Sequence, residues 1–260
     1  MQWAAQTGRR DYHIFCVGLD RQPRRFQRVR AQLQRMGEAV HFVSGVDGGT
    51  LPEMASRTLT HGSSGRMKGT LGCFLSHVRV WEICAASDMP YAFVIEDDTC
   101  FVLPPPPNTA SLETGGSDFD LCFVNEGAQN AIFAPGNLPF DKAVPLETVL
   151  THPVDSFRGV GTYGYFVSRQ GAQKLLDMVA QDGLVGDVDW RLLLYAASDD
   201  SIKASASEFM LRSLKVHLDH RKSTGLLNAI VAPPAIVKTY NGGSIRGVMN
   251  DFSHAYEELA

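Results

Sequence analysis

The stretch YAFVIEDDT, Tyr91–Thr99, places five apolar or aromatic residues directly before three adjacent acids. Such a short apolar run predicts a strand that is buried on both faces, as in a parallel sheet. In open α/β sheets, ligands collect at the carboxyl ends of the strands, because the loops converge there beyond the sheet. We therefore expect Glu96, Asp97 and Asp98 to lie at a ligand-binding edge.

The segments on both sides of this stretch alternate between strand and helix patterns. Short apolar runs predict strands, and apolar residues at helical spacing predict helices. In chain order we expect a strand at 11–19, a helix at 21–37, a strand at 40–49, a helix at 69–87, a strand at 119–127, a strand, turn and helix at 159–181, a helix at 187–198 and a strand at 214–218. This order predicts an α/β fold with a mainly parallel central sheet flanked by helices.

Length and composition predict a single globular domain. A chain of 260 residues with 44% hydrophobic content can bury a large core. We expect residues 1–260 to form one domain with two functional halves, 11–125 and 126–260. The net charge of -4 argues against a protein that binds nucleic acid through bulk positive charge.

The cysteines and the N-terminus predict a cytoplasmic location. The five cysteines contain no C-x-x-C pair, and most lie in apolar runs where a thiol behaves as a small hydrophobe. The first residues lack a signal-peptide pattern, and no apolar run reaches the roughly 20 residues that cross a bilayer. The basic helix at 21–35 still allows peripheral association with the inner face of a membrane.

The three acids at the end of the strand need a partner for their charge. Adjacent carboxylates repel one another, and a divalent cation with oxygen ligands, Mn²⁺ or Mg²⁺, relieves that cost. Alternation along an extended chain places Glu96 and Asp98 on one side and Asp97 on the other. We expect Glu96 and Asp98 to bind the ion and Asp97 to contact backbone or ligand. The alternative is a solvated turn in which one acid caps the next element.

Five stretches of the chain carry a familiar set of motifs in a fixed order. They are VGLDRQPRR (17–25), GTLGCFLSHVRVWE (69–82), FVIEDD (93–98), GTYGYFVSRQGAQKLL (161–176) and DVDW (187–190). In this order they resemble the motifs of glycosyltransferase family 25, the lipopolysaccharide-type β-galactosyltransferases. One departure is Gly18, which stands where that family usually has Asn.

The resemblance implies a GT-A-like nucleotide-sugar fold and an inverting, metal-dependent hexosyltransferase. The donor would be a UDP-sugar, with galactose the expected hexose, and a divalent ion would bridge its diphosphate. The acceptor would be a saccharide or glycolipid in the synthesis of cell-surface glycan or lipopolysaccharide. Residues 11–125 would then form the nucleotide-sugar and metal half, and residues 126–260 the acceptor half.

The matched motifs also imply which residues bind the donor. Arginine can bind phosphate with its planar fork, and an acid can hold a base or ribose. The donor-binding candidates are Asp20, Arg21, Arg25, Ser76, His77, Asp97 and Tyr163. The plainer interpretations are a solvated helix face for the first three, a core histidine for His77 and sheet packing for Tyr163.

An inverting transfer needs a base that takes the proton of the acceptor hydroxyl as it attacks. Asp189 is the first candidate, through its place in the DVDW stretch, and Asp187 and Glu126 are alternatives. Either aspartate could instead cap the start of a helix, which aspartate does well.

Two other function classes stay open. A metal-dependent phosphoesterase or nucleotidyltransferase also uses acids at strand ends, although it should show more acid and histidine ligands on several strands. A non-catalytic nucleotide-sugar-binding protein could keep the same scaffold. We expect the loops at 50–68 and 127–155 to shape the donor and acceptor pockets.

Overall fold

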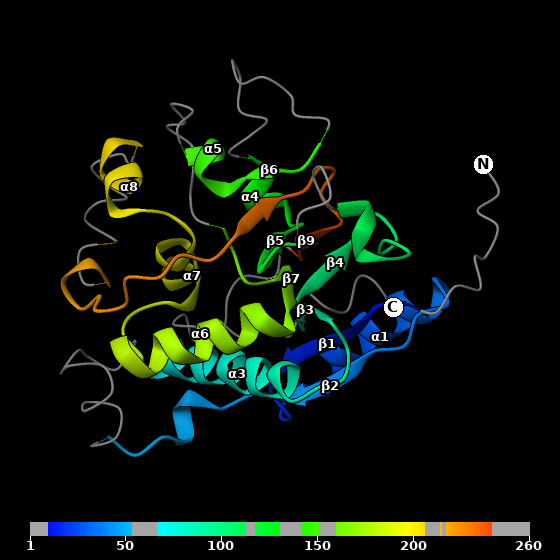
Figure 1. The fold of residues 1–260 in the computed structure, drawn as a ribbon. Helices are drawn as coiled ribbons and strands as arrows, with labels where there is room; N and C mark the ends of the chain where they lie inside the picture. Colours follow the sequence, from blue (N-terminus) through cyan, green and yellow to red (C-terminus); the bar gives the residue numbers. More distant parts are fainter. Residues whose placement is uncertain are drawn as a thin grey trace.

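A seven-stranded sheet in the order β2-β1-β3-β7-β5-β8-β6 forms the centre of the fold (Figure 1). The computed structural model describes residues 10–53, 67–112, 118–130, 142–150, 160–205, 214 and 217–240. Most of the predicted loops at 50–68 and 127–155 lie outside these residues.

The strands and helices predicted before residue 199 occur in the predicted order, and the structure adds further short elements that were not predicted. The strands are β1 (Tyr12–Gly18), β2 (His41–Ser44), β3 (Tyr91–Glu96), β4 (Thr99–Phe101), β5 (Leu121–Phe123), β6 (Val144–Pro145), β7 (Gly164–Ser168), β8 (Ala229–Val231) and β9 (Val237–Thr239). The helices are α1 (Pro23–Arg35), α3 (Met67–Ala85), α4 (Glu126–Asn130), α5 (Leu146–Leu150), α6 (Arg169–Asp182), α7 (Val188–Ala196) and α8 (Asp199–Ser205), with 3₁₀ turns η1 (Gly48–Thr50) and η2 (Thr109–Leu112). The strand predicted at 214–218 is wrong, because Leu214 and His217–Asp219 are helical.

The strand directions confirm an α/β fold with a mainly parallel central sheet. β1 pairs in parallel with β2 and β3, and β5 pairs in parallel with β8. β7 is antiparallel to both of its neighbours, β3 and β5, so it starts at the edge where they end. The residues just before β7 therefore lie at the same edge as the acids that follow β3.

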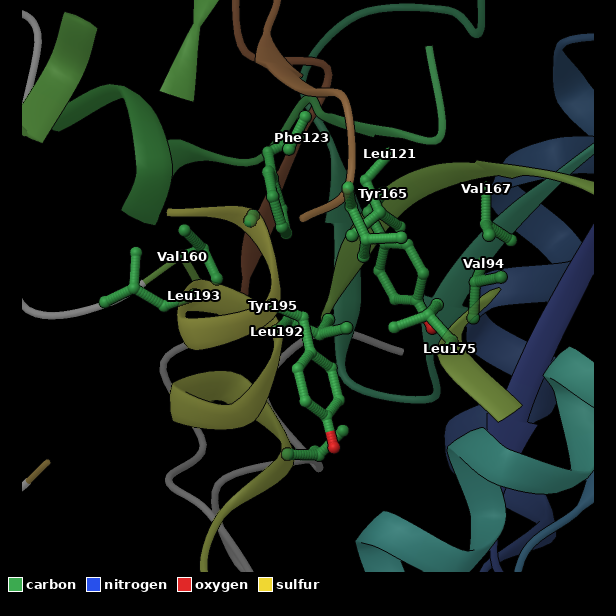
Figure 2. Close-up of a cluster of buried hydrophobic side chains, with 14 of the residues drawn as sticks. Val94, Leu121, Phe123, Val160, Tyr165, Val167, Leu175, Leu192, Leu193 and Tyr195 are labelled. Atoms are coloured by element: carbon green, nitrogen blue, oxygen red, sulfur yellow. The ribbon is translucent and has the colours of Figure 1, made fainter. Parts of the chain in front are cut away.

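Side chains of the sheet alternate between two hydrophobic clusters. Ala92 and Val94 of β3 pack with residues of α3, α6 and α7 on one face. Phe93 and Ile95 pack with Val29 and other residues of α1 on the opposite face. Figure 1 shows α3 and α6 side by side, and Figure 2 shows part of the first cluster around Tyr165 and Tyr195. The apolar runs read as buried strands are buried on both faces.

A buried polar cluster holds the start of α7, the helix that carries Asp189. Arg191 of α7 has no exposed surface, and its Nη1 lies 3.4 Å from Asp182 Oδ2 at the end of α6. Asp182 also accepts hydrogen bonds from the backbone amides of Lys222 and Ser223, both at 2.7 Å. Burial alone would raise the pKa of Asp182, but these hydrogen bonds and Arg191 outweigh it and hold the pKa below its ordinary value.

His217, a buried residue of this cluster, is expected to make the folded protein less stable in mild acid. Burial, with Arg191 and His220 nearby, lowers the pKa of His217 from 6.5 to about 3. Below pH 6.5 the unfolded chain therefore binds a proton at this position that the folded chain does not bind, so stability falls as pH falls. We expect this residue to contribute a loss of at most about 1.4 kcal/mol per pH unit between pH 6.5 and 4.

Urea unfolding at pH 7 and at pH 5 would measure this effect. His217→Asn should reduce the difference between the two pH values, since the variant has no imidazole to protonate. His41→Asn, at an exposed position on β2, is the matched control and should leave the difference unchanged. Equal pH dependence in the wild type and His217→Asn would contradict the prediction.

Candidate functional site

The acids that follow β3 diverge toward the two faces of the sheet. Glu96 is the last residue of β3 and continues its alternation, so it lies on the face of Ala92 and Val94, beside α3. Asp97 follows on the α1 face. Asp97 and Asp98 form a tight turn before β4, so the alternation of an extended strand no longer applies to Asp98.

Arg25 of α1 holds both aspartates of this turn. Its Nε lies 3.0 Å from Asp97 Oδ1, and its Nη2 lies 2.8 Å from Asp98 Oδ2. Arg25 and Asp97 are buried, and Asp97 also accepts a hydrogen bond from the Leu19 amide. Burial raises the pKa of Asp97 to about 7, although Arg25 opposes the shift. The expectation that Glu96 and Asp98 share one side is therefore not met, because Asp98 lies with Asp97.

The position of Asp97 also explains the glycine at the end of β1. A Cβ atom added to Gly18 would lie 2.6 Å from Asp97 Oδ2. An asparagine there would displace the carboxylate that binds Arg25 and Leu19. The departure at Gly18 is thus a local consequence of an inward-facing Asp97.

Glu96 and a second acid, Asp189, contact the same hydroxyl group. Thr162, two residues before β7, has its Oγ1 2.5 Å from Glu96 Oε1 and 2.6 Å from Asp189 Oδ1. A threonine hydroxyl has one hydrogen and can donate it to only one acceptor at a time. Two acidic side chains from different elements thus converge on one buried threonine, which concentrates negative charge at this edge. Such a site favours a cation or an entering hydroxyl group.

His77 supports this acidic edge from the interior. It is fully buried on α3, and its Nδ1 lies 3.0 Å from the Tyr165 hydroxyl, which also accepts a hydrogen bond from Trp81 Nε1 at 2.9 Å. The other ring nitrogen, Nε2, lies 3.6 Å from Glu96 Oε1. His77 therefore reaches the site through Glu96 rather than through an exposed surface of its own.

The remaining donor candidates from the first motifs lie around the ends of β1 and β2. Asp20 Oδ2 accepts a hydrogen bond from Ser44 Oγ at 2.6 Å, and this hydrogen bond is exposed to solvent. Arg21 pairs with Asp47 at 2.6 Å and lowers the pKa of that acid. These residues are placed where a solvent-borne ligand can reach them.

Ser76 lies on the same side but is occupied with the fold. Its Oγ accepts a hydrogen bond from the Val46 amide at 2.8 Å and donates one to the Gly72 carbonyl at 2.6 Å. In this arrangement Ser76 joins α3 to the segment that follows β2.

The other candidates lie around α4 and the start of α7. Tyr163 Oη accepts a hydrogen bond from the Gly127 amide at 2.5 Å, and burial raises the pKa of Tyr163 to about 12. Tyr163 therefore positions α4, whose first residue is the exposed Glu126. Asp187 stands at the N-cap of α7, yet its side chain makes no capping hydrogen bond. Asp189, in the first turn, faces Thr162 instead.

Thr162 and Cys73 are not among the site residues predicted from the sequence. Thr162 precedes β7, and its place beside Glu96 follows from the antiparallel direction of that strand, which no local pattern reveals. Cys73 lies one helical turn before His77, but a cysteine in an apolar helix is ordinarily a core residue. The spacing of Cys73 and His77, four residues apart on one helix face, was the sequence signal that could have indicated a shared site.

The fold and the site define an α/β protein with acids gathered at the carboxyl edge of its sheet. Residues 11–103 match the family described as "Glycosyltransferase family 25 (LPS biosynthesis protein)". This segment of the chain is therefore similar to glycosyltransferase family 25. The match includes the motifs at 17–25, 69–82 and 93–98, whereas those at 161–176 and 187–190 lie beyond it.

Several curated proteins resemble parts of the chain. The human "Inactive glycosyltransferase 25 family member 3" is 37% identical over 98 residues, which are 34% of this chain and 16% of that protein. The human "Procollagen galactosyltransferase 2" is 28% identical over 177 residues, 63% of this chain and 27% of that protein. A Drosophila melanogaster "Glycosyltransferase 25 family member" is 28% identical over 186 residues, 66% of this chain and 29% of that protein. The chain thus matches less than a third of the length of these relatives.

A solved structure of a glycosyltransferase involved in the glycosylation of the major capsid of PBCV-1 also aligns. The alignment covers 95% of this chain and 99% of that one, with a TM-score of 0.38 and 10% identity. This likeness is too distant to bear on the site.

Proposed function

We propose that the chain is an inverting glycosyltransferase that moves a hexose, galactose first among them, from a UDP-sugar to a saccharide or glycolipid acceptor. The observation that carries the proposal is the convergence of Glu96 and Asp189 on Thr162 Oγ1, at the carboxyl edge of β3. Glu96 lies inside the segment that matches the family. The galactosyl part of the proposal takes support from the name of one relative.

Asp189 is the proposed catalytic base. It is half-buried, and its contact with Thr162 fixes one carboxylate oxygen at the edge where a ligand would enter. The other oxygen could then accept the proton of an acceptor hydroxyl as that hydroxyl attacks the sugar. Asp187 and Glu126 stay as alternative bases, since Asp187 stands at the N-cap of the helix that carries Asp189 and Glu126 is exposed at the start of α4.

The proposed donor site lies around the ends of β1 and β2. Arg21 and Asp20 are exposed there, and a guanidinium group binds phosphate oxygens well. Arg25 has a different role in this proposal, because it is buried and paired with Asp97 and Asp98, whereas the ion pair of Arg21 is exposed. It positions the turn after β3, and Asp97, Ser76, His77 and Tyr163 likewise support the walls of the site.

A divalent ion, Mn²⁺ or Mg²⁺, remains part of the proposal, and it would supply Lewis-acid stabilisation of the departing diphosphate. The two expected ligands do not converge, because Asp98 is paired with Arg25 and Glu96 lies on the other face. No step of the transfer is therefore assigned to the ion. UDP release measured with and without Mn²⁺ tests whether the reaction requires the ion.

A non-catalytic nucleotide-sugar-binding protein is the second candidate. One of the two human relatives has the word "inactive" in its name, which favours this candidate. The pairing of Asp97 and Asp98 with Arg25 favours it as well. The phosphoesterase class gains no support, since the described residues place only one histidine, His77, beside the acids of the β3 end.

No helix among the described residues has both the length and the apolar character to cross a bilayer. All five cysteines lie in described parts of the chain and are free thiols. The cytoplasmic location and the peripheral membrane association remain proposals.

Release of UDP from a panel of UDP-sugars, with and without Mn²⁺, tests the function. We expect one donor to be hydrolysed slowly without an acceptor, and Glu96→Gln to lower that rate at least about tenfold, because one acidic group of the site is lost. Asp177→Asn, on the exposed face of α6, is the matched control and should retain the wild-type rate.

The outcomes separate the candidates. Turnover only with Mn²⁺ would support the ion, and turnover without any metal would remove it from the proposal. Binding of a UDP-sugar by a folded protein without turnover would favour the non-catalytic candidate. If no UDP-sugar bound or reacted, the UDP-sugar assignment would be wrong.

A further inference from the structure

Cys73 and His77 stand one turn apart on the same face of α3, directly opposite Glu96 at the end of β3. One potential ligand atom from each of these residues lies within 4.8 Å of the other two. In one of these pairs, His77 Nε2 and Glu96 Oε1 are 3.6 Å apart. Bonds of about 2.0–2.3 Å in a tetrahedral site hold ligand atoms roughly 3.3–3.8 Å apart. The three side chains therefore need only a small closure to bind one ion.

The environment of His77 is a second and independent observation. The side chain is fully buried, and its Nε2 makes no hydrogen bond with any described residue. A buried polar atom without such a partner costs about 1–3 kcal/mol, so a ligand at Nε2 would relieve a real penalty. Nδ1 meets the Tyr165 hydroxyl, which Trp81 also holds. Metal-binding imidazoles are commonly oriented in this way, through the nitrogen that does not bind the metal.

We propose that Cys73, His77 and Glu96 bind a divalent cation of the zinc type. Sulfur and imidazole ligands favour such ions over Mg²⁺ and Mn²⁺, which prefer oxygen. Three protein ligands leave a fourth position for water or substrate, as in catalytic rather than structural zinc sites. Glu96 also contacts Thr162, so the ion would lie beside the threonine hydroxyl group that contacts both Glu96 and Asp189. The proposal does not depend on sugar transfer.

Titration of the intact chain with Co²⁺, a spectroscopic substitute for zinc, tests the site. We expect one equivalent of Co²⁺ to bind with a thiolate-to-cobalt charge-transfer absorption, and Zn²⁺ to displace it. Cys73→Ser should remove this absorption and weaken Zn²⁺ binding at least tenfold. Cys100→Ser changes a thiol of similar partial burial on β4, outside the cluster, and should keep both properties.

Glu96→Gln is a second variant that tests the site even if Cys73→Ser does not fold. Glu96 is partly exposed at a strand end, so its substitution should not disturb the fold. It should keep the fold by circular dichroism, keep the thiolate absorption and weaken Zn²⁺ binding at least tenfold. The proposal is overturned if the wild-type protein shows no thiolate absorption, or if Cys73→Ser retains it. Neither readout uses activity, so a protein that binds Co²⁺ in this way but turns over no UDP-sugar would keep the site and lose the proposed function.

Discussion

Asp189→Asn is expected to lower the rate of sugar transfer by about 10²- to 10⁴-fold, the usual contribution of a general base. The amide can still accept the hydrogen bond from Thr162 Oγ1, now 2.6 Å from Asp189 Oδ1, so the local structure should survive. It cannot take a proton from an acceptor hydroxyl. The measurement is transfer from the donor identified by UDP release to a saccharide acceptor, under saturating and limiting acceptor concentrations.

The two alternative bases make this experiment selective. Asp187→Asn and Glu126→Gln remove the other acids that could take the proton. If Asp189 is the base, its amide variant should lose far more activity than either of these, and the thermal melting of all three should stay close to wild type. A larger loss in Asp187→Asn or Glu126→Gln would transfer the role to that residue.

Thr162→Val extends the same argument to the residue that positions Asp189. It is nearly isosteric and removes only the hydroxyl between the two acids. Because the carboxylate of Asp189 would remain, the loss of rate should be smaller than in Asp189→Asn. A variant as inactive as Asp189→Asn would mean that the hydroxyl itself contacts the reacting groups.

The sequence predicted the scaffold of the site better than its side-chain pairings. The apolar run at 91–95 and its neighbours are buried on both faces, because parallel-sheet strands in this fold are covered by helices on both sides. Alternation also predicted correctly that Glu96 and Asp97 point to opposite faces. These properties depend on the local period of the chain, which sequence displays directly.

The prediction that Asp98 lies on the side of Glu96 was wrong because the strand ends two residues before Asp98, so strand alternation does not extend to it. Glu96 is the last residue of β3, and the turn that follows brings Asp98 to Arg25 on α1. The contact of Glu96 with Thr162 depends on β7 running antiparallel beside β3. Both facts arise from long-range pairing, and neither leaves a local pattern.

The second large effect is expected in stability rather than in chemistry, at the buried pair of Asp182 and Arg191. Asp182→Asn should lower the free energy of unfolding by about 3–5 kcal/mol, the usual cost when one partner of a buried ion pair is removed. The side chains of both residues are wholly inaccessible to solvent. The variant would leave the guanidinium of Arg191 without its counter-charge in the interior.

Hydrogen bonding adds to the cost of this change. Oδ2 of Asp182 accepts a hydrogen bond from Ser223 Oγ at 2.9 Å and faces Arg191 Nη1, whereas Oδ1 accepts two backbone amides. An asparagine has one oxygen for these donors, so its amide nitrogen would oppose either the arginine or the backbone N–H groups. A buried donor is then left unsatisfied whichever way the amide turns.

Urea unfolding at pH 7 measures the effect, with Asp177→Asn on the exposed face of the same helix as the matched control. The control should change stability by less than about 0.5 kcal/mol, since it alters only a surface position. Because Arg191 belongs to α7, loosening this cluster should also loosen the helix that carries Asp189. Transfer activity of Asp182→Asn should therefore decline at lower temperatures than that of the wild type. A change of less than 1 kcal/mol in Asp182→Asn would show that the pair is not what holds α7 in place.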